Sequence, residues 1–312
     1  MNGMELSRAY YEEYGKPMLA EFPQLQPYLA AGLTGSGSEC FGFDDEVSRD
    51  HDFEPGFCIF LPGEDIVDRK SAFQLERAYA KLPKEFLGFR RSVMQPVGGA
   101  RHGVLRISEF FTEKTGTADG AMSLTEWLTV PEASLAEAVN GTLFFDNYGE
   151  ITRIRQQLSC YPEDIRRKKL AGHLLLMAQA GQYNYTRCLQ HGEPGAAQLA
   201  VFAFAESCME VIFLLNRRYR PYYKWSFRSL RTLDKLPILA ELLEYLITSD
   251  NSGDSAEEKY RVIEDIAGDV IDELMEQKLT QAVCGDLEKH AYSVNDTITD
   301  PQIRNMHILA AV

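Results

Sequence analysis

The pattern of hydrophobic residues changes near residue 150, and this change constrains the fold more than any other feature. Before it, short apolar runs such as residues 57–61 and 141–145 alternate with helical patterns, as in mixed α/β domains. After it, apolar residues recur at helical spacing over long stretches, and strand patterns disappear. We therefore expect an α/β unit over residues 1–150 and an all-α helical bundle over residues 151–312.

Several elements of the first part are predicted individually. Apolar side chains at every fourth position predict a helix over about the first 30 residues: Leu6, Tyr10, Tyr14 and Met18. A second helix is predicted over residues 71–83 and would end at Pro83. Residues 102–108 predict a strand, and Ser108 is expected to cap a short helix that ends at Gly116.

Charge and cysteine content narrow the class of protein. The chain has 312 residues, of which 45% are hydrophobic, and its formal net charge is −14. This charge argues against general nucleic-acid binding, which depends on Lys and Arg neutralising phosphates. No uninterrupted apolar run approaches the length of about 18 residues that a membrane span needs, and the first residues do not resemble a signal peptide. We therefore expect no membrane association. The six cysteines lack paired spacing, so we also expect no zinc site, no disulfides and a cytoplasmic location.

The stretch GSGSECFGFDDEVSRDHDF, at residues 35–53, carries the clearest chemical signal. On a strand, Asp50 and Asp52 would point the same way, and two carboxylates that close repel each other unless a cation lies between them. A divalent metal bound to a phosphate, Mg²⁺ or Mn²⁺, is the usual solution. Gly37 and Ser38 would then hold the phosphates of a nucleotide through backbone amides and a hydroxyl.

Two other interpretations of this stretch compete with the nucleotide site. The first is an ordinary glycine-rich turn followed by a solvated acidic loop. The second is a dinucleotide-binding G-x-G-x-x-G turn, suggested by Gly35, Gly37 and Gly42. The spacing of the third glycine and the lack of a clear strand before the turn argue against this second interpretation.

The motif resembles the signature of a known superfamily. Gly37-Ser38, eleven residues, Asp50-His51-Asp52 and then an apolar strand are similar to the signature of the polymerase-β-like nucleotidyltransferases. Four further segments are similar to an uncharacterised bacterial nucleotidyltransferase-like family that joins such a domain to a helical C-terminal domain: YPEDIRRKKLA, AQAGQYNYTRCLQHGE, FLLNRRYRPYYKW and HAYSVNDTITDPQIR. The resemblance implies a nucleotidyltransferase-type mixed sheet followed by a helical bundle.

This resemblance also implies a reaction and a set of site residues. Gly37 and Ser38 would contact the nucleotide phosphates, and Asp50 and Asp52 would bind the metal. A third carboxylate normally lies on a neighbouring strand as metal ligand or base, and the two candidates here are Asp146, slightly preferred, and Glu109. The implied reaction moves a nucleoside monophosphate, AMP from ATP or from another NTP in its place, onto an acceptor hydroxyl and releases pyrophosphate.

A cluster of cations and aromatics lies in the second part, at residues 216–228 (NRRYRPYYKWSFR). Tyr219, Tyr223 and Trp225 could offer flat faces to a base, while Lys224 and Arg228 could meet phosphates. Similarity to antibiotic nucleotidyltransferases implies that Lys224 holds the triphosphate with Tyr223 beside it. The alternative is a helix end whose cations face the helix dipole and whose aromatics fill a core.

Residues 166–169 form a run of four cations, Arg-Arg-Lys-Lys. Four consecutive residues wrap around a helix and cannot form one flat binding face. A solvated surface is therefore expected, and the functional alternative is a site for a polyanionic acceptor such as tRNA.

Three functions remain open from the sequence. The preferred one is a metal-dependent nucleotidyltransferase, with a small molecule favoured as acceptor and a protein or tRNA as alternatives. The second is a nucleotide-binding sensor or interaction protein of the same fold that lacks a complete acidic triad. The third is a protein that adenylates a partner protein or RNA.

Overall fold

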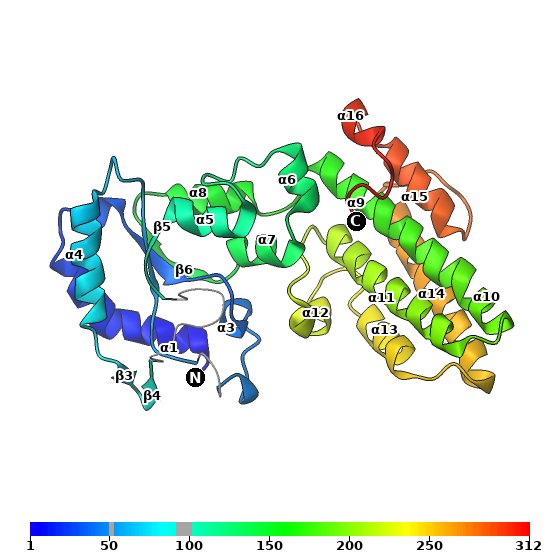
Figure 1. The fold of residues 1–312 in the computed structure, drawn as a ribbon, viewed down its shortest axis with the longest axis horizontal. Coiled ribbons are helices and arrows are strands. Elements are labelled where there is room, and N and C mark those ends of the chain that lie inside the picture. Colours follow the sequence, from blue (N-terminus) through cyan, green and yellow to red (C-terminus); the bar gives the residue numbers. More distant parts are fainter. Residues whose placement is uncertain (50–52, 92–101) are drawn as a thin grey trace. The chain divides into compact units, whose positions relative to one another are not determined.

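The structure of the chain is a computed structural model that describes three stretches: residues 1–49, 53–91 and 102–312. The chain forms two compact units, each with its own core (Figure 1). The first unit comprises Met1–Glu126 and Val130–Ser159, and the second comprises Trp127–Thr129 and Cys160–Val312. The expected combination of a mixed α/β part and a helical part is thus present in the fold.

A four-stranded mixed sheet forms the centre of the first unit. Its strands are β1 (Ala30–Leu33), β2 (Cys58–Leu61), β5 (Gly103–Arg106) and β6 (Thr142–Asp146), in the order β5-β2-β1-β6. β1 is antiparallel to both β2 and β6, whereas β2 and β5 are parallel. β2, β5 and β6 all lie where the sequence predicts strands, whereas the sequence does not predict β1.

The strand directions define two different ends of this sheet. Cys58 pairs with Gly32 and with Gly103, and Thr142 pairs with Leu33. One end therefore contains the last residue of β1 and the first residues of β2, β5 and β6, and we call it the turn end.

Helices cover the sheet and complete the first unit (Figure 1). α1 (Gly3–Tyr10), η1 (Tyr11–Gly15) and α2 (Lys16–Ala20) form one continuous helix, which confirms most of the first predicted helix. The other elements are η2 (Gln26–Tyr28), α3 (Ser38–Phe41), η3 (Val47–Arg49), α4 (Arg69–Ala80), β3 (Glu85–Phe86), β4 (Phe89–Arg90), α5 (Ile107–Thr115), α6 (Leu124–Thr129), α7 (Glu132–Val139) and α8 (Glu150–Gln157). Gly116 ends α5 as expected, whereas the residue that precedes α5 is Arg106 and not Ser108.

The π-helical segment η1 makes room for a buried aromatic ring. Phe57 is fully buried, and its ring centroid lies 5.3 Å from that of Tyr11 and 5.1 Å from that of Tyr79. A methyl group at Gly15 would overlap the Phe57 ring. A widened helical turn at a glycine therefore lets the helix approach β2 closely.

Replacing this glycine is expected to cost stability. Gly15→Ala should lower the free energy of unfolding by about 1–3 kcal/mol, because the core around Phe57 must shift to admit the methyl group. Gly268→Ala is the matched control: Gly268 is also helical but has open space around it, so alanine there should be neutral or stabilising. Urea unfolding of both variants measures the difference, and equal stabilities would contradict the close packing.

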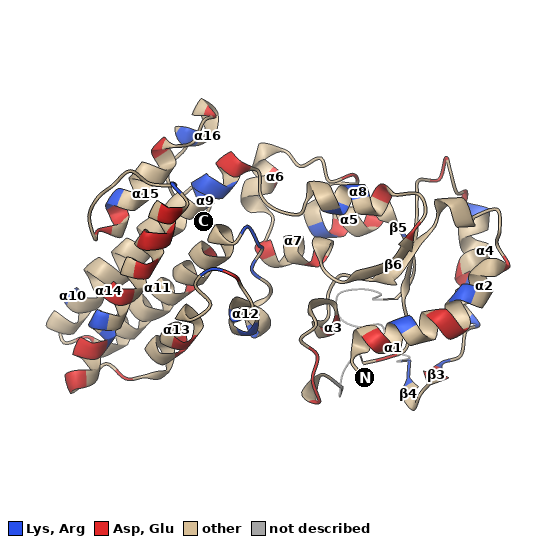
Figure 2. Ribbon diagram, turned by 180° about the vertical axis from the view of Figure 1, so that it is seen from behind, with Lys and Arg blue, Asp and Glu red and all other residues tan. Residues whose placement is uncertain are grey.

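The second unit consists of helices. They are α9 (Glu163–Met177), η4 (Ala178–Asn184), α10 (Tyr185–Gln190), α11 (Pro194–Leu215), α12 (Tyr223–Leu230), α13 (Leu239–Thr248), α14 (Gly253–Glu276), α15 (Leu287–Asp296) and α16 (Pro301–Arg304). α9 packs against both α11 and α15. Figure 2 shows acidic residues along α14 and basic residues on α12 and the loop before it.

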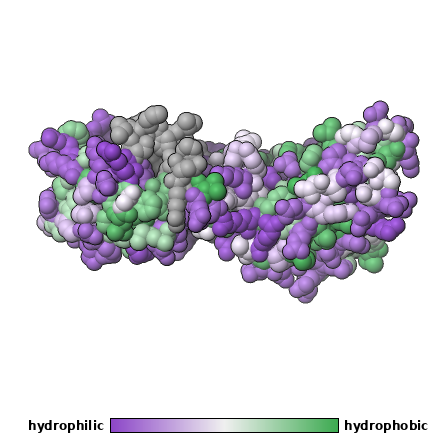
Figure 3. All heavy atoms as spheres, turned by 90° about the horizontal axis from the view of Figure 1, so that it is seen from below, coloured by the Kyte–Doolittle hydropathy of each residue, from purple (hydrophilic) through white to green (hydrophobic). Residues whose placement is uncertain are grey.

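α11 is the one helix of the described residues that is long and apolar enough to cross a membrane. Of its most apolar window, 67% is buried inside the structure, as is common for the core helix of a globular unit. On the face of the molecule drawn in Figure 3, hydrophobic residues gather in several patches among hydrophilic ones.

Residues 166–169 lie neither on a solvated face nor on a surface for a polyanion, so both expectations for this run are wrong. Arg166, Lys168 and Lys169 are 2%, 0% and 5% exposed. All four side chains donate hydrogen bonds within their own unit. Arg166 donates to Glu163 and Leu214, and Arg167 donates to Glu163 and Thr297. Lys168 donates to Asn295, Arg304 and Met306, and Lys169 donates to Ala311. Arg167, Lys168 and Lys169 therefore fasten α9 to the C-terminal segment of the unit, and Arg166 bonds to α11.

Glu163, at the start of α9, holds three guanidinium groups. Its carboxylate lies 2.8 Å from Arg166, 3.0 Å from Arg167 and 2.9 Å from Arg217. Partial burial opposes its ionisation, but the hydrogen bonds and charges of these arginines outweigh burial and lower the pKa of Glu163 from 4.5 to about 2.

A depressed carboxyl pKa makes stability depend on pH. The stabilisation from Glu163 is complete above the unfolded-state pKa of 4.5 and is lost as the pH falls towards about 2. We expect Glu163→Gln to lower the free energy of unfolding at pH 6 and to reduce its fall between pH 6 and pH 3. Urea unfolding at a series of pH values measures this, and parallel pH curves for the two proteins would contradict it.

Candidate functional site

The Gly–Ser turn (residues 34–38) directly follows β1 and leads into α3. Gly35 and Gly37 have φ angles of +105° and +135°, which side chains other than glycine rarely adopt. Asn140, just before β6, fixes the turn: its Oδ1 accepts from the Gly35 amide at 2.9 Å, and its Nδ2 donates to the Gly35 carbonyl at 2.8 Å. Two segments far apart in sequence thus hold the turn in one conformation.

β1 corrects one argument made from the sequence. A strand does precede the turn, so its supposed absence cannot count against a dinucleotide-binding turn. The topology argues against that interpretation instead, because β1 and β2 are antiparallel and dinucleotide-binding turns belong to parallel β-α-β units.

The turn presents polar groups that have no protein partner among the described residues. The amides of Ser36, Gly37 and Ser38 have no acceptor there. The hydroxyl of Thr34, a residue only 5% exposed, is buried and likewise has no hydrogen-bond partner in residues 1–49, 53–91 and 102–312. A buried polar group without a partner costs about 1–3 kcal/mol, so such groups often mark a place where a ligand or water completes the bonding.

Glu39 places a negative charge against this turn. A methyl group at Gly37 would overlap the Glu39 carboxylate, which shows how closely that carboxylate approaches the turn. Burial first, and the charge of Glu39 in addition, raise the pKa of the neighbouring Cys58 thiol to about 12. Cys58 therefore remains a neutral thiol and is no nucleophile, while Glu39 would repel a phosphate unless a cation lies between them.

Arg155 of α8 supports the segment that holds the turn. Its Nη2 donates to the carbonyl oxygens of Val139, at 2.6 Å, of Asn140, and of Gly141, at 3.4 Å. Burial lowers the pKa of its guanidinium, which nevertheless remains cationic at neutral pH. Arg155 thus fixes Asn140, which in turn fixes Gly35.

Asp50 and Asp52, the predicted metal ligands, lie outside the described residues. The chain on either side of them is anchored close to the turn end. Asp44 accepts a hydrogen bond from the Gly3 amide at 2.6 Å, and a methyl group at Gly3 would contact both Glu39 and Phe53.

The sequence did not single out a second pair of residues at this end. Nδ1 of His102 lies 3.3 Å from a carboxylate oxygen of Glu54, and both side chains are largely buried. Glu54 precedes β2 and His102 directly precedes β5, so the pair belongs to the turn end. Only the pairing of β2 with β5 brings these residues together, and no local sequence pattern reveals it.

The two predicted third carboxylates, Asp146 and Glu109, are not at the turn end. Asp146 pairs with Ala30, the first residue of β1, about 10 Å along the strands from the turn. Glu109 follows Arg106, the last residue of β5, and lines a pocket of about 360 Å³ beside α4. The structure therefore brings neither Asp146 nor Glu109 to the Gly–Ser turn.

Asp146 has a structural task instead. One carboxylate oxygen accepts from the Gly149 amide at 2.8 Å and the other from the Thr152 amide at 2.9 Å, so Asp146 caps α8. Asp146→Ala is expected to lower the free energy of unfolding by about 1 kcal/mol, as loss of a helix cap does. Nucleotide binding should not change, and a variant with unchanged stability but lost binding would contradict this role.

The cation and aromatic cluster of the second unit divides into two sets. Tyr219 is buried, with its ring centroid 4.9 Å from that of Tyr161, so it offers no face to a base. Tyr223 and Lys224 begin α12 and are exposed, and Lys224 Nζ lies 5.1 Å from the centroid of the Trp225 ring. Contact of Lys224 and Tyr223 with a nucleotide remains a prediction.

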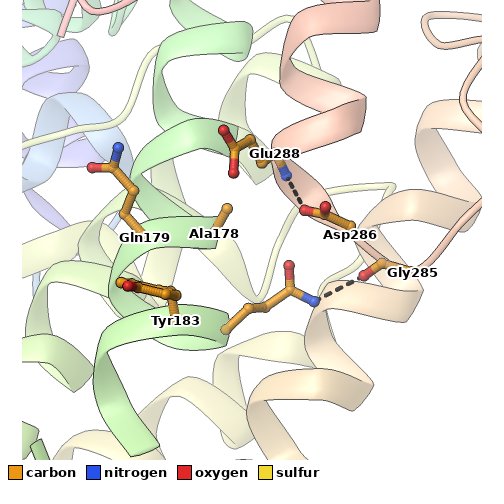
Figure 4. A pocket seen from close by; sticks show the side chains of 7 residues that line it. Ala178, Gln179, Tyr183, Gly285, Asp286 and Glu288 are labelled. Atoms are coloured by element: carbon orange, nitrogen blue, oxygen red, sulfur yellow. Dashed lines mark hydrogen bonds between the residues drawn. The ribbon is translucent and has the colours of Figure 1, made fainter. Parts of the chain in front are cut away.

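A pocket of about 480 Å³ lies between η4 and the segment before α15 (Figure 4). Gln179 and Tyr183 lie on its η4 side, and Asp286 and Glu288 lie across from them. Gln182, which also lines the pocket, uses both hydrogens of its amide: Nε2 donates to Glu264 and to the Gly285 carbonyl, and Oε1 accepts from the Leu287 amide. This side chain therefore links three elements of the unit and has a structural task.

Within the part of the chain that the structure describes, no group of three or more His, Cys, Asp or Glu side chains could hold a metal ion. The donors at the turn end are nevertheless of the type that Mg²⁺ prefers, because Glu39, Glu54 and Thr34 all offer oxygen. The described residues thus fit a hard cation without enclosing one.

Comparisons with known proteins find a family model for part of the chain and a distant structural neighbour. Residues 127–226 match the model of a domain of unknown function, DUF4037. The crystal structure of a nucleotidyltransferase-like protein from Exiguobacterium sibiricum 255-15 is 11% identical, with a TM-score of 0.38, covering 93% of this chain and 81% of that one. No curated protein matches the sequence. The chain therefore has a nucleotidyltransferase-like structural neighbour at low similarity, and its central third matches a domain family without an assigned activity.

Proposed function

We propose that this protein transfers a nucleoside monophosphate, AMP from ATP, onto an acceptor hydroxyl and releases pyrophosphate. One observation carries the proposal: the Gly–Ser turn, with its unpartnered amides and the buried Thr34 hydroxyl, lies at the sheet end where β2 begins. Asp50 and Asp52 come shortly before β2 in the sequence. The place of the turn at the end where β2 begins, and the place of the acidic motif shortly before β2 in the sequence, together support the proposal.

Each residue then has a defined task. The amides of Ser36, Gly37 and Ser38 donate to phosphate oxygens, as glycine-rich turns do. Asp50 and Asp52 hold Mg²⁺, which when bound neutralises charge on the phosphates. Because Glu39 lies against the turn, nucleotide binding is expected to require the divalent cation.

Glu54 replaces Asp146 and Glu109 as the proposed third acidic residue. It lies at the turn end, and His102 holds its carboxylate in one orientation. In the second unit, Lys224 and Tyr223 remain the candidates for contact with the nucleotide that the resemblance implies. The acceptor is proposed to be a small molecule.

A nucleotide sensor without turnover is the second candidate. The observation in its favour is that Glu54 already interacts with His102, which leaves its carboxylate less available to a metal. Such a protein would bind ATP with Mg²⁺ and release no pyrophosphate.

Labelled nucleotides test the proposal and separate the two candidates. The chain is incubated with Mg²⁺, a small-molecule extract and either α-labelled or γ-labelled ATP. Transfer of the α label, with release of pyrophosphate and no transfer of the γ label, is the expected result. Calorimetric binding of ATP in Mg²⁺ without label transfer would favour the sensor, and no binding in Mg²⁺ would refute both.

A further inference from the structure

A basic surface lies on the loop before α12 and on α12 itself. From Val211 to Leu233 the sequence contains six Arg and Lys residues and no acidic residue, in a chain of net charge −14. Figure 2 shows these basic residues together on α12 and the loop that precedes it. Such a local surplus of positive charge in an acidic protein indicates a site for an anionic partner.

Three of the six cations form ion pairs within the unit. Arg217 pairs with Glu163 at 2.9 Å, Arg220 with Glu210 at 2.6 Å, and Arg231 with Glu244. These three position the loop and the end of α12. The other three, Arg218, Lys224 and Arg228, are all exposed.

Aromatic rings lie among these three cations. Tyr222 and Tyr223 are 54% and 69% exposed, and their ring centroids are 4.3 Å apart. Lys224 and Arg228 both lie over the Trp225 ring, at 5.1 and 5.8 Å from its centroid. We name the set Arg218, Tyr222, Tyr223, Lys224 and Arg228 the α12 patch.

We infer that the α12 patch binds single-stranded RNA. Proteins bind single strands by stacking bases on exposed aromatic rings and by placing Lys and Arg against the backbone. A free nucleotide offers one base and one cluster of phosphates. The patch instead presents two exposed rings with cations on both sides of them in the sequence, from the loop into the helix. This inference goes beyond the proposed reaction and does not depend on it.

An anionic membrane is the competing partner for such a surface. Membrane-bound helices insert a face of aliphatic and aromatic side chains into the lipid. Among the apolar residues of α12, Leu230 is buried and Trp225 and Phe227 are half-buried, so the exposed rings of the patch are tyrosines. Polar aromatic rings between cations favour stacking on bases over insertion into lipid.

Fluorescence anisotropy with a labelled 12-nucleotide single-stranded RNA tests the inference on the full chain. We expect saturable binding at 50 mM salt. The slope of log K against log salt should correspond to about two phosphate contacts, because each contact with a single strand contributes roughly −0.7 to that slope. Tyr222→Ser with Tyr223→Ser should weaken binding at least about fivefold through lost stacking. Arg218→Ser with Lys224→Ser should weaken it and lower the salt slope.

Matched controls make each outcome decisive. Lys70→Ser with Lys289→Ser removes the same charge from exposed lysines elsewhere and should leave binding unchanged. The inference is overturned if the wild-type chain binds no RNA, if the patch variants bind as the control does, or if anionic vesicles bind while RNA does not. It is also overturned if ATP displaces RNA as effectively as the unlabelled oligonucleotide at equal phosphate concentration. Asp50→Ala should retain RNA binding, which separates this inference from the proposed reaction.

Discussion

Replacement of either aspartate of the Asp50-His51-Asp52 motif is expected to lower the rate of pyrophosphate release at least a hundredfold. Asp50→Ala and Asp52→Ala each remove a carboxylate that the proposal assigns to Mg²⁺. Loss of one preorganised charge-stabilising group from an active site typically costs about a hundredfold to a thousandfold in rate. The loss should appear in the rate and also in the affinity for ATP in the presence of Mg²⁺.

Two controls distinguish this effect from a general loss of structure. Glu46→Ala removes an exposed acid a few residues earlier in the sequence and should retain the wild-type rate. Asp146→Ala should also retain it, because the structure places Asp146 at the far end of the sheet. Pyrophosphate is measured by a coupled assay, and wild-type rates for both Asp50→Ala and Asp52→Ala would end the proposal.

Removal of the Lys168 ammonium is expected to destabilise the second unit strongly. Lys168 is fully buried, and its three donors reach Asn295 at 2.9 Å, the Arg304 carbonyl at 3.3 Å and the Met306 carbonyl at 2.7 Å. Desolvation lowers its pKa, and all three acceptors are neutral, so no ion pair offsets the burial. Its stability contribution lies in these bonds.

Lys168→Met keeps most of the length of the side chain but leaves the buried acceptors without a donor. The expected loss in the free energy of unfolding is about 2–4 kcal/mol, since each unsatisfied buried group costs about 1–3 kcal/mol and some acceptors regain water. Lys70→Met, an exposed lysine in α4, should change stability by less than about 0.5 kcal/mol. Denaturant unfolding compares them, and a Lys168→Met protein as stable as the control would show that these bonds contribute little.

The sequence predicts the helices of this protein well and its sheet less well. Apolar residues at helical spacing predict α11 and α14, because such a pattern holds for any helix with one buried face. β1 escaped prediction because AAGL is short and has neither a β-branched nor an aromatic residue. Its place in the sheet comes from pairing with β2 and β6, which are distant in sequence.

In the candidate site, too, the sequence predicts local structure but not the contacts between distant segments. Gly37 and Ser38 are recognisable because a local turn needs particular residues, and the structure places them in a turn with positive φ at Gly37. Asp146 and Glu109 were chosen because each lies at or just after a strand. Which end of a sheet a strand end occupies depends on strand direction, and sequence spacing alone does not reveal it.

The cations of α9 were misassigned for a different physical reason. Lys and Arg are almost never fully buried unless they have partners, so a run of four predicts a surface. The partners of Lys168 are carbonyl oxygens and a side-chain amide more than a hundred residues away. Backbone carbonyls leave no trace in a sequence pattern, so this burial could not be foreseen.

The distance along the chain between these partners has a consequence for biosynthesis. The acceptors of Lys168 and Lys169 follow them by 127 to 142 residues. At a translation rate of about 5–20 residues per second, roughly 6–30 s pass between synthesis of these lysines and synthesis of the groups that accept their hydrogen bonds. During that interval a nascent α9 must keep two ammonium groups hydrated, so we expect these two lysines to become buried only after residues 295–311 have been synthesised.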